Sequence, residues 1–137
     1  MAVAIAAPSS GTITAVDSPR HRRTAVLRPR LRVLRGPDVA LGPGKVALLE
    51  AIDRAGSMAA AARSLGMSYM RAWTLVRTMN RSFRAPLVRA VRGGAGRGTT
   101  RLTAAGSAVV SLYREMEARG LRAAARPWAR LRRRLKA

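Results

Sequence analysis

Cysteine is absent from this 137-residue chain, and histidine occurs once, at His21. Zinc sites, iron–sulfur clusters and cysteine–histidine nucleophilic centres need ligands that such a chain does not offer. Only six residues are acidic, and Glu115 and Glu117 lie two apart on a predicted helix, where they should not share a face. We therefore predict no enzyme activity, no catalytic residues, no metal and no cofactor.

Long apolar runs are missing as well. No run approaches the roughly 20 residues needed to span a bilayer, and residues 1–7 are too short and uncharged to be a signal peptide. The lack of cysteine fits a reducing compartment. We expect a soluble, cytoplasmic protein without a membrane span.

Positive charge is what the chain has in excess. Its 27 Lys and Arg residues against 6 Asp and Glu give a formal net charge of +21, and no Asp or Glu occurs between Arg54 and Arg114. A phosphate-binding surface is the simplest explanation. A genome rich in arginine and alanine codons would also raise the basicity, but it does not explain the missing carboxylates.

Composition divides the chain into three parts. Residues 1–29 are rich in Ala, Pro, Ser and Arg without periodicity, which is typical of a disordered basic arm. A folded domain is expected over residues 30–120, beginning with a short strand at Leu31 to Leu34 and a helix from Lys45 to Ala55 that ends at Gly56. Residues 121–137 are expected to form a basic amphipathic tail. Pro127 should interrupt its helical spacing, although a new helix could start there. The tail could lie on nucleic acid or anionic membrane, or fray.

Residues 56–80 are expected to form two short helices joined by a tight turn. Ser57 is a plausible N-cap for the first helix and Ser68 for the second, and Gly66 supplies the backbone freedom of the turn. In the second helix a 100° step per residue gathers one apolar face, which we expect to point at the core: Ala72, Leu75, Val76, Met79 and Phe83.

The opposite face of that second helix carries hydroxyls, a thioether and arginines. Arginine is the commonest bidentate partner of guanine, and threonine offers a hydroxyl or a methyl group to a base edge. An ordinary solvated face is the alternative, which the neighbouring capped helix disfavours. The candidate DNA readers are Met70, Thr74, Arg77 and Arg81, flanked by Arg71 and Thr78.

A β-hairpin should follow. Leu87 to Arg92 alternates like a strand, the glycine-rich stretch from Gly93 to Thr100 forms the tip, and Arg101 and Leu102 return. The tip resembles a phosphate-binding P-loop only in its glycine spacing, because Thr99 stands where the lysine should be. Donors for DNA phosphate or the minor groove are Arg97, Thr99 and Thr100; a mobile tip without contacts is the alternative.

The last predicted helix has an apolar seam. Thr103 can cap it, and Ala105, Val109, Leu112 and Met116 repeat at helical spacing. This stripe suits pairing with a second subunit, although packing back onto its own domain is equally compatible with the spacing.

These motifs resemble the N-terminal winged helix-turn-helix domain of ModE-type, molybdate-responsive regulators. The most specific shared elements are Ser68-Tyr69, Ala72-Trp73 and Met79-Asn80, followed by Gly93-Gly94 and Leu102-Thr103 with Gly106. LysR-type regulators share the Gly56 to Ser68 spacing, whereas Tyr69 and Trp73 favour the ModE type. The resemblance implies a homodimer formed through the first and last helices, with Met70 to Arg81 and Gly93 to Thr100 presented to palindromic DNA. Full-length members also carry C-terminal oxyanion-binding domains, and we expect no direct molybdate binding by this chain.

We thus predict a mainly α-helical fold with a small antiparallel β-sheet, a winged helix-turn-helix with a long C-terminal dimerisation helix. The function expected is sequence-specific binding of double-stranded DNA in transcription regulation, with a link to molybdenum genes. The alternatives are a nucleoid-type DNA- or RNA-binding protein that is indifferent to sequence and a membrane-surface protein anchored by the basic amphipathic C-terminus. The predicted DNA-binding residues are Ser57, Ser68, Tyr69, Met70, Arg71, Trp73, Thr74, Arg77, Thr78, Arg81, Arg92, Arg97, Thr99 and Thr100; the predicted dimerisation residues are Ala105, Val109, Leu112, Tyr113 and Met116.

Overall fold

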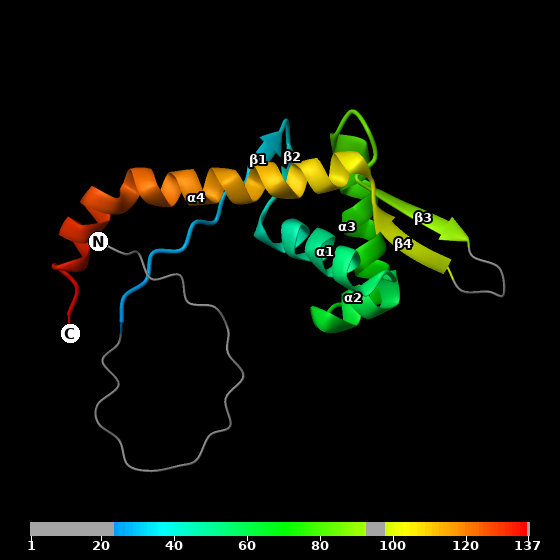
Figure 1. Cartoon of the computed structure of the whole chain (residues 1–137), viewed down its shortest axis with the longest axis horizontal. Coiled ribbons are helices and arrows are strands. Elements are labelled where there is room, and N and C mark those ends of the chain that lie inside the picture. Colours follow the sequence, from blue (N-terminus) through cyan, green and yellow to red (C-terminus); the bar gives the residue numbers. More distant parts are fainter. Residues whose placement is uncertain (1–23, 93–97, 137) are drawn as a thin grey trace, which may run out of the picture.

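The computed structural model describes residues 24–92 and 98–136 (Figure 1). Four helices and two antiparallel two-stranded sheets make up this part of the chain. The predicted mainly α-helical fold with a small antiparallel sheet and a long C-terminal helix is confirmed. The predicted arm, residues 1–29, and the hairpin tip, residues 93–97, lie wholly or mostly outside the described residues. In order, the elements are β1 Val33–Arg35, β2 Asp38–Leu41, α1 Pro43–Ala55, α2 Met58–Ser64, α3 Tyr69–Ser82, β3 Val88–Arg92, β4 Gly98–Leu102 and α4 Ala104–Arg132.

A hairpin of β1 and β2 precedes the helices. The strand predicted at residues 31–34 occurs two residues later, and the pairing strand β2 was not predicted. Gly36 turns the chain between them with φ of 57°, a left-handed conformation that glycine adopts without steric cost. Because Ala40 and Leu41 at the end of β2 are buried, the hairpin covers one side of the core.

The helix boundaries follow the predicted caps. The Ser57 Oγ accepts a hydrogen bond from the Ala60 N–H at 3.1 Å, and the Ser68 Oγ accepts one from the Arg71 N–H at 3.1 Å. Gly56 ends α1 with φ of 70°, and Gly66 turns the chain between α2 and α3 with φ of 65°. The helix-turn-helix predicted for residues 56–80 is confirmed.

One apolar core joins α1, α2, α3 and the start of α4. The predicted inner face of α3 is confirmed, because Ala72, Val76 and Met79 are buried and Leu75 and Phe83 pack against them. The largest fully buried side chains come from several elements: Val46, Leu48, Leu49, Ile52, Val76, Met79, Leu87 and Tyr113.

The junction of α3, β3 and α4 is held by close polar contacts. The Asn80 Oδ1 accepts from the N–H groups of Leu87 at 2.8 Å and Val88 at 3.3 Å, and the Asn80 Nδ2 donates to the Val88 carbonyl at 3.1 Å. The Thr103 N–H donates to the Leu87 carbonyl at 2.9 Å. Gly106 comes so near that a Cβ placed on it would lie 2.1 Å from the Leu87 carbonyl oxygen.

Helix α4 is longer than predicted. Thr103 caps it, with its Oγ1 accepting from the Gly106 N–H at 3.0 Å, and the helix continues through Gly120 and Pro127 to Arg132. The predicted interruption at Pro127 is therefore wrong. The proline lies on an exposed stretch, where water can satisfy the carbonyl that its missing N–H leaves unpaired. The C-terminal half of α4 projects beyond α1, α2 and α3 (Figure 1).

Candidate nucleic-acid interface

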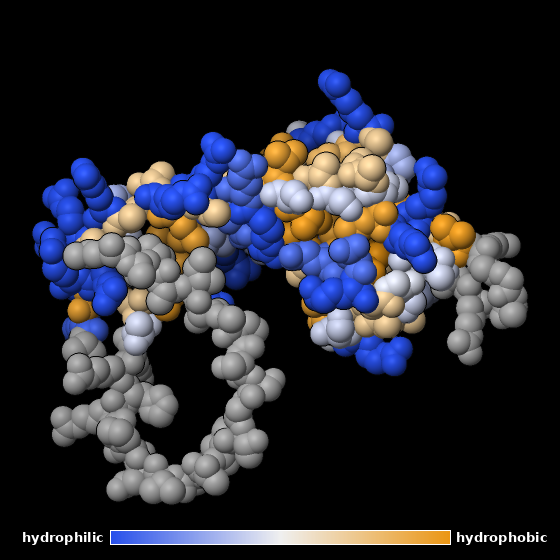
Figure 2. Space-filling view, viewed as in Figure 1, coloured by the Kyte–Doolittle hydropathy of each residue, from blue (hydrophilic) through white to orange (hydrophobic). Residues whose placement is uncertain are grey.

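The outward face of α3 presents the predicted readers. Tyr69 is 52% and Met70 66% exposed, and Arg71, Thr74, Arg77 and Arg81 are exposed as well, whereas Thr78 is half-buried. Because no Asp or Glu lies between residues 54 and 114, no carboxylate from α3 or the following hairpin neutralises this face. The helix therefore offers a cationic and weakly polar surface, on the side of the molecule away from its apolar core. On the face of the molecule that Figure 2 shows, hydrophilic side chains gather most densely over the C-terminal half of α4 and around the rim of the domain, with apolar groups in its middle.

The hydroxyl groups of the two threonines in α3 already donate hydrogen bonds within the helix. The Thr74 Oγ1 donates to the Met70 carbonyl at 2.9 Å, and the Thr78 Oγ1 donates to the Thr74 carbonyl at 3.0 Å. Hydroxyls bonded back to the preceding turn keep their lone pairs free. Thr74 consequently presents an acceptor and a methyl group, while donation is left to the arginines.

Two predicted contact residues, Tyr69 and Trp73, form an aromatic pair. Their ring centroids are 6.2 Å apart with an interplanar angle of 78°, an edge-to-face arrangement. Trp73 is half-buried and packs against the core, so it is Tyr69 that reaches solvent. Trp73 thereby supports the position of Tyr69 at the start of α3.

The β3–β4 hairpin separates its residues into two faces by strand alternation. Thr99, whose Oγ1 donates to the Val91 carbonyl at 3.4 Å, is half-buried. Thr100 is only 4% exposed, and its N–H donates to the Gly56 carbonyl at 3.0 Å. The prediction that Thr100 offers its side chain to DNA is therefore wrong, because it lies on the inner face.

The same alternation exposes two arginines that the site prediction omitted. Arg89 and Arg101 are directly opposed across β3 and β4, and both are exposed. The period of two in the sequence could have identified them, because Thr99 and Arg101 must share one face and Thr100 the other. The predicted Arg92 lies at the end of β3, and the predicted Arg97 lies outside the described residues.

The predicted dimerisation stripe splits in the structure. Ala105 and Val109 pack against the core of their own domain, whereas Leu112 is 57% and Met116 47% exposed. Tyr113 is 1% exposed and its hydroxyl donates to the Leu31 carbonyl at 2.8 Å. The prediction of Tyr113 as a contact to a second subunit is therefore wrong, because its ring is used within the chain.

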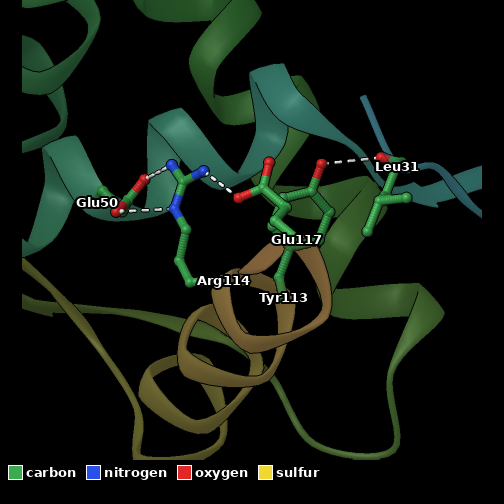
Figure 3. A network of polar contacts seen from close by, with 5 residues as sticks. All are labelled: Leu31, Glu50, Tyr113, Arg114 and Glu117. Atoms are coloured by element: carbon green, nitrogen blue, oxygen red, sulfur yellow. Dashed lines mark hydrogen bonds and ion pairs between the residues drawn. The ribbon is translucent and has the colours of Figure 1, made fainter. Parts of the chain in front are cut away.

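Next to Tyr113, an ion network ties α4 to α1. The Arg114 guanidinium bonds Glu50 of α1 and also lies 2.6 Å from Glu117, as Figure 3 shows. The hydrogen bond with Glu50 is the main reason that the pKa of Arg114 is raised, and burial raises the pKa of Tyr113. Ion pairs in the part of the chain that the structure describes involve only Arg114 and Arg119, away from α3.

Neither a membrane helix nor a metal cluster occurs in residues 24–92 and 98–136. No helix there is long and apolar enough to cross a bilayer, and no three His, Cys, Asp or Glu side chains gather as metal ligands.

Helix, glycine turn and helix, followed by a two-stranded hairpin and a long helix, define a winged helix-turn-helix domain. Residues 44–107 match the family model of the bacterial regulatory helix-turn-helix protein, lysR family. This segment of the chain is therefore similar to the helix-turn-helix domains of that family.

Curated relatives share the same part of the chain. It is 44% identical over 86 residues to the molybdenum-pterin-binding protein MopB of Rhodobacter capsulatus, which covers 63% of this chain and 32% of MopB. It is 44% identical over 78 residues to the molybdenum transport protein ModE of Azotobacter vinelandii, covering 57% of this chain and 29% of that protein. The DNA-binding transcriptional dual regulator ModE of Escherichia coli (strain K12) is 35% identical over 71 residues, which cover 52% of this chain and 27% of ModE.

The resemblance to ModE-type regulators is thus confirmed, and the chain spans about a third of the length of these relatives. Among solved structures, a CbnR_DBD–DNA complex is similar with a TM-score of 0.49 and 26% identity, covering 64% of this chain and 95% of that one.

Proposed function

We propose that this chain is a transcriptional regulator that reads duplex DNA with α3 and holds the flanking backbone with the β3–β4 hairpin. The observation that carries the proposal is the exposed face of α3, which has arginines and threonines, no carboxylate, and a capped partner helix behind it. A second helix held in this way by a first is the unit that enters a DNA major groove.

Within that face, donors and acceptors are divided between residue types. Arg77 and Arg81 supply donors suited to guanine O6 and N7. Thr74, whose hydroxyl proton is engaged with the Met70 carbonyl, supplies an acceptor for a base amino group or a methyl contact to thymine. Arg71 and Tyr69, at the start of the helix, are suited to the edge of the groove.

The β3–β4 hairpin is suited to contact the phosphate backbone of DNA. Like charges placed directly opposite one another on neighbouring strands are destabilising. Arg89 and Arg101 are such a pair, and a phosphate between them would relieve the repulsion. They join Arg97 and Thr99 as the proposed contacts of the wing.

We also propose that two copies pair through the exposed part of the α4 stripe. Leu112 and Met116 lie one turn apart and are about half exposed, beside the ion pairs that Arg114 makes between α4 and α1. A two-fold axis here would place two copies of α3 in successive major grooves, about 34–36 Å apart, so the operator would be an inverted repeat.

The relatives named for molybdenum direct the choice of targets. MopB is named for binding molybdenum-pterin and the ModE proteins for molybdenum transport or transcription. Genes of molybdenum uptake and use are accordingly the first operators to test, in the cytoplasm where bacterial DNA lies.

Affinity for a selected operator and for random duplex, measured at several salt concentrations, tests this function. Arg77→Ala should weaken operator binding by about 1–3 kcal/mol and leave random duplex nearly unchanged. Arg101→Ala should weaken both alike and lower the salt slope by about one phosphate contact. Arg122→Ala is the control, because it removes the same charge from the half of α4 that projects away from α3 and the hairpin (Figure 1). Equal affinity for all duplexes would contradict the proposed sequence-specific regulator and favour a nucleoid-type protein.

Sedimentation tests the dimer. Leu112→Glu should give a monomer, because it places a carboxylate in an apolar contact, and should lose the inverted-repeat footprint before it loses weak binding to random duplex. Ser111→Glu adds the same charge at a neighbouring exposed position and should sediment like the unmodified protein. If the unmodified protein stayed monomeric at tens of micromolar, both free and on DNA, the proposed dimer would be ruled out.

A further inference from the structure

A basic hollow lies beside α3, and of its cationic residues only Arg71 belongs to the DNA contact proposed above. Its volume is about 540 Å³, and its walls come from the segment before β1, the first turn of α1 and the first turns of α3. Four of its lining residues are cationic, namely Arg30, Arg32, Lys45 and Arg71.

The charge of this hollow is uncompensated by its own walls. No carboxylate lines it, and none of its four cations has an ion-pair partner among residues 24–92 and 98–136. The Lys45 ammonium instead donates to the carbonyl of Val39, another lining residue from β2. Burial lowers the pKa of Lys45, and the nearby Asp38 carboxylate partly opposes this shift. The Lys45 ammonium is therefore partly removed from water.

We infer that the hollow formed by Arg30, Arg32, Lys45 and Arg71 binds a phosphate group. Three of these four residues are arginines, and guanidinium groups bind phosphate oxygens through paired N–H donors. An anion bound in the hollow would reduce the repulsion among the four like charges that line it.

The position of Arg71 identifies the phosphate source that fits best. Its side chain lines the hollow, while its backbone N–H is bonded to the Ser68 cap that starts α3. The hollow therefore continues the edge of the α3 face, and a duplex seated on α3 would bring a backbone phosphate to it. In this form the inference rests on the proposed function and widens the DNA footprint to residues 30–45.

Salt-dependent DNA affinity is the first arm of the test. The double variant Arg30→Gln, Arg32→Gln should bind operator and random duplex more weakly and reduce the slope of log K against log salt by about 0.9 for each phosphate that it no longer neutralises. Both arginines are exposed, so the fold should persist, as circular dichroism can verify. The control is Arg122→Gln, Arg126→Gln, which removes two charges from the projecting half of α4 and should leave the slope unchanged.

Inorganic phosphate without DNA is the second arm. Amide chemical shifts of Gly44 and Lys45 are followed against chloride at equal ionic strength. A reduced slope in the first arm with no saturable shift in the second identifies the DNA backbone, whereas a saturable shift that the double variant abolishes identifies a free anion site. Equal slopes for both double variants, together with no saturable shift, would overturn the inference, while a retained effect of Arg77→Ala would leave the proposed function intact.

Discussion

Replacing Gly106 by alanine should destabilise the protein although alanine is the better helix former. Gly106 lies in the first turn of α4, and a Cβ on it would come within 2.1 Å of the Leu87 carbonyl oxygen and 3.0 Å of its carbon. Both are backbone atoms of a fully buried residue, which no side-chain rotation can move aside. Helix and strand would have to separate.

The magnitude follows from three terms. Overpacking against an immobile neighbour costs about 1–3 kcal/mol. The two hydrogen bonds of Thr103, to the carbonyls of Leu87 and Pro86, lose geometry at about 1 kcal/mol each. Helix propensity returns about 1 kcal/mol, so the net loss in the free energy of unfolding is about 2–4 kcal/mol.

Urea unfolding followed by circular dichroism measures this loss. With a slope of about 1–2 kcal/mol per molar urea, the midpoint of Gly106→Ala should fall by about 1 M or more. Gly120→Ala is the matched control in the same helix, since nothing lies within 4 Å of its added methyl group. That variant should gain up to about 1 kcal/mol. A Gly106→Ala protein as stable as the Gly120→Ala protein would refute the reasoning.

Four further outcomes are expected. Asn80→Ala should cost about 2–3 kcal/mol in urea unfolding because it leaves the buried Leu87 N–H unpaired, whereas Asn80→Asp, which keeps the acceptor, should cost less. Ser68→Ala should lose about 1 kcal/mol with the cap; Ser68→Asp should keep the stability yet weaken DNA binding in an anisotropy titration, since it adds a carboxylate beside α3. Arg114→Met should cost under about 1 kcal/mol, because the Arg114 side chain is 47% exposed, and a larger loss would mean that the ion network anchors α4. Molybdate should shift the melting temperature no more than sulfate does, because a ligand stabilises only by selective binding.

Local signals predicted most of the helix-turn-helix. Ser57, Ser68 and Thr103 each cap the helix that follows them, and Gly56 and Gly66 adopt the left-handed turns expected of them. These features depend on a few consecutive residues, so the sequence states them directly. The inner face of α3 follows in the same way from helical spacing.

Contacts between distant segments were not predictable in this manner. The Asn80 bonds to β3 join residues seven and eight positions apart through a side chain, and Tyr113 reaches Leu31 across 82 positions. Nothing local distinguishes Gly106, which permits a close approach, from Gly120, which faces open space. The inward side of Thr100 was available from strand alternation, but the glycine-rich tip obscured where β4 begins.

The bond from the Thr100 N–H to the Gly56 carbonyl joins the middle of β4 to the corner between α1 and α2. The hairpin is thereby held against the helices by a contact within the chain itself. Under the proposed function, a duplex would have to adjust to this arrangement, and its bending and groove width cost different amounts in different sequences. A protein built in this way would discriminate among sites by their stiffness, at base pairs that none of its side chains touches.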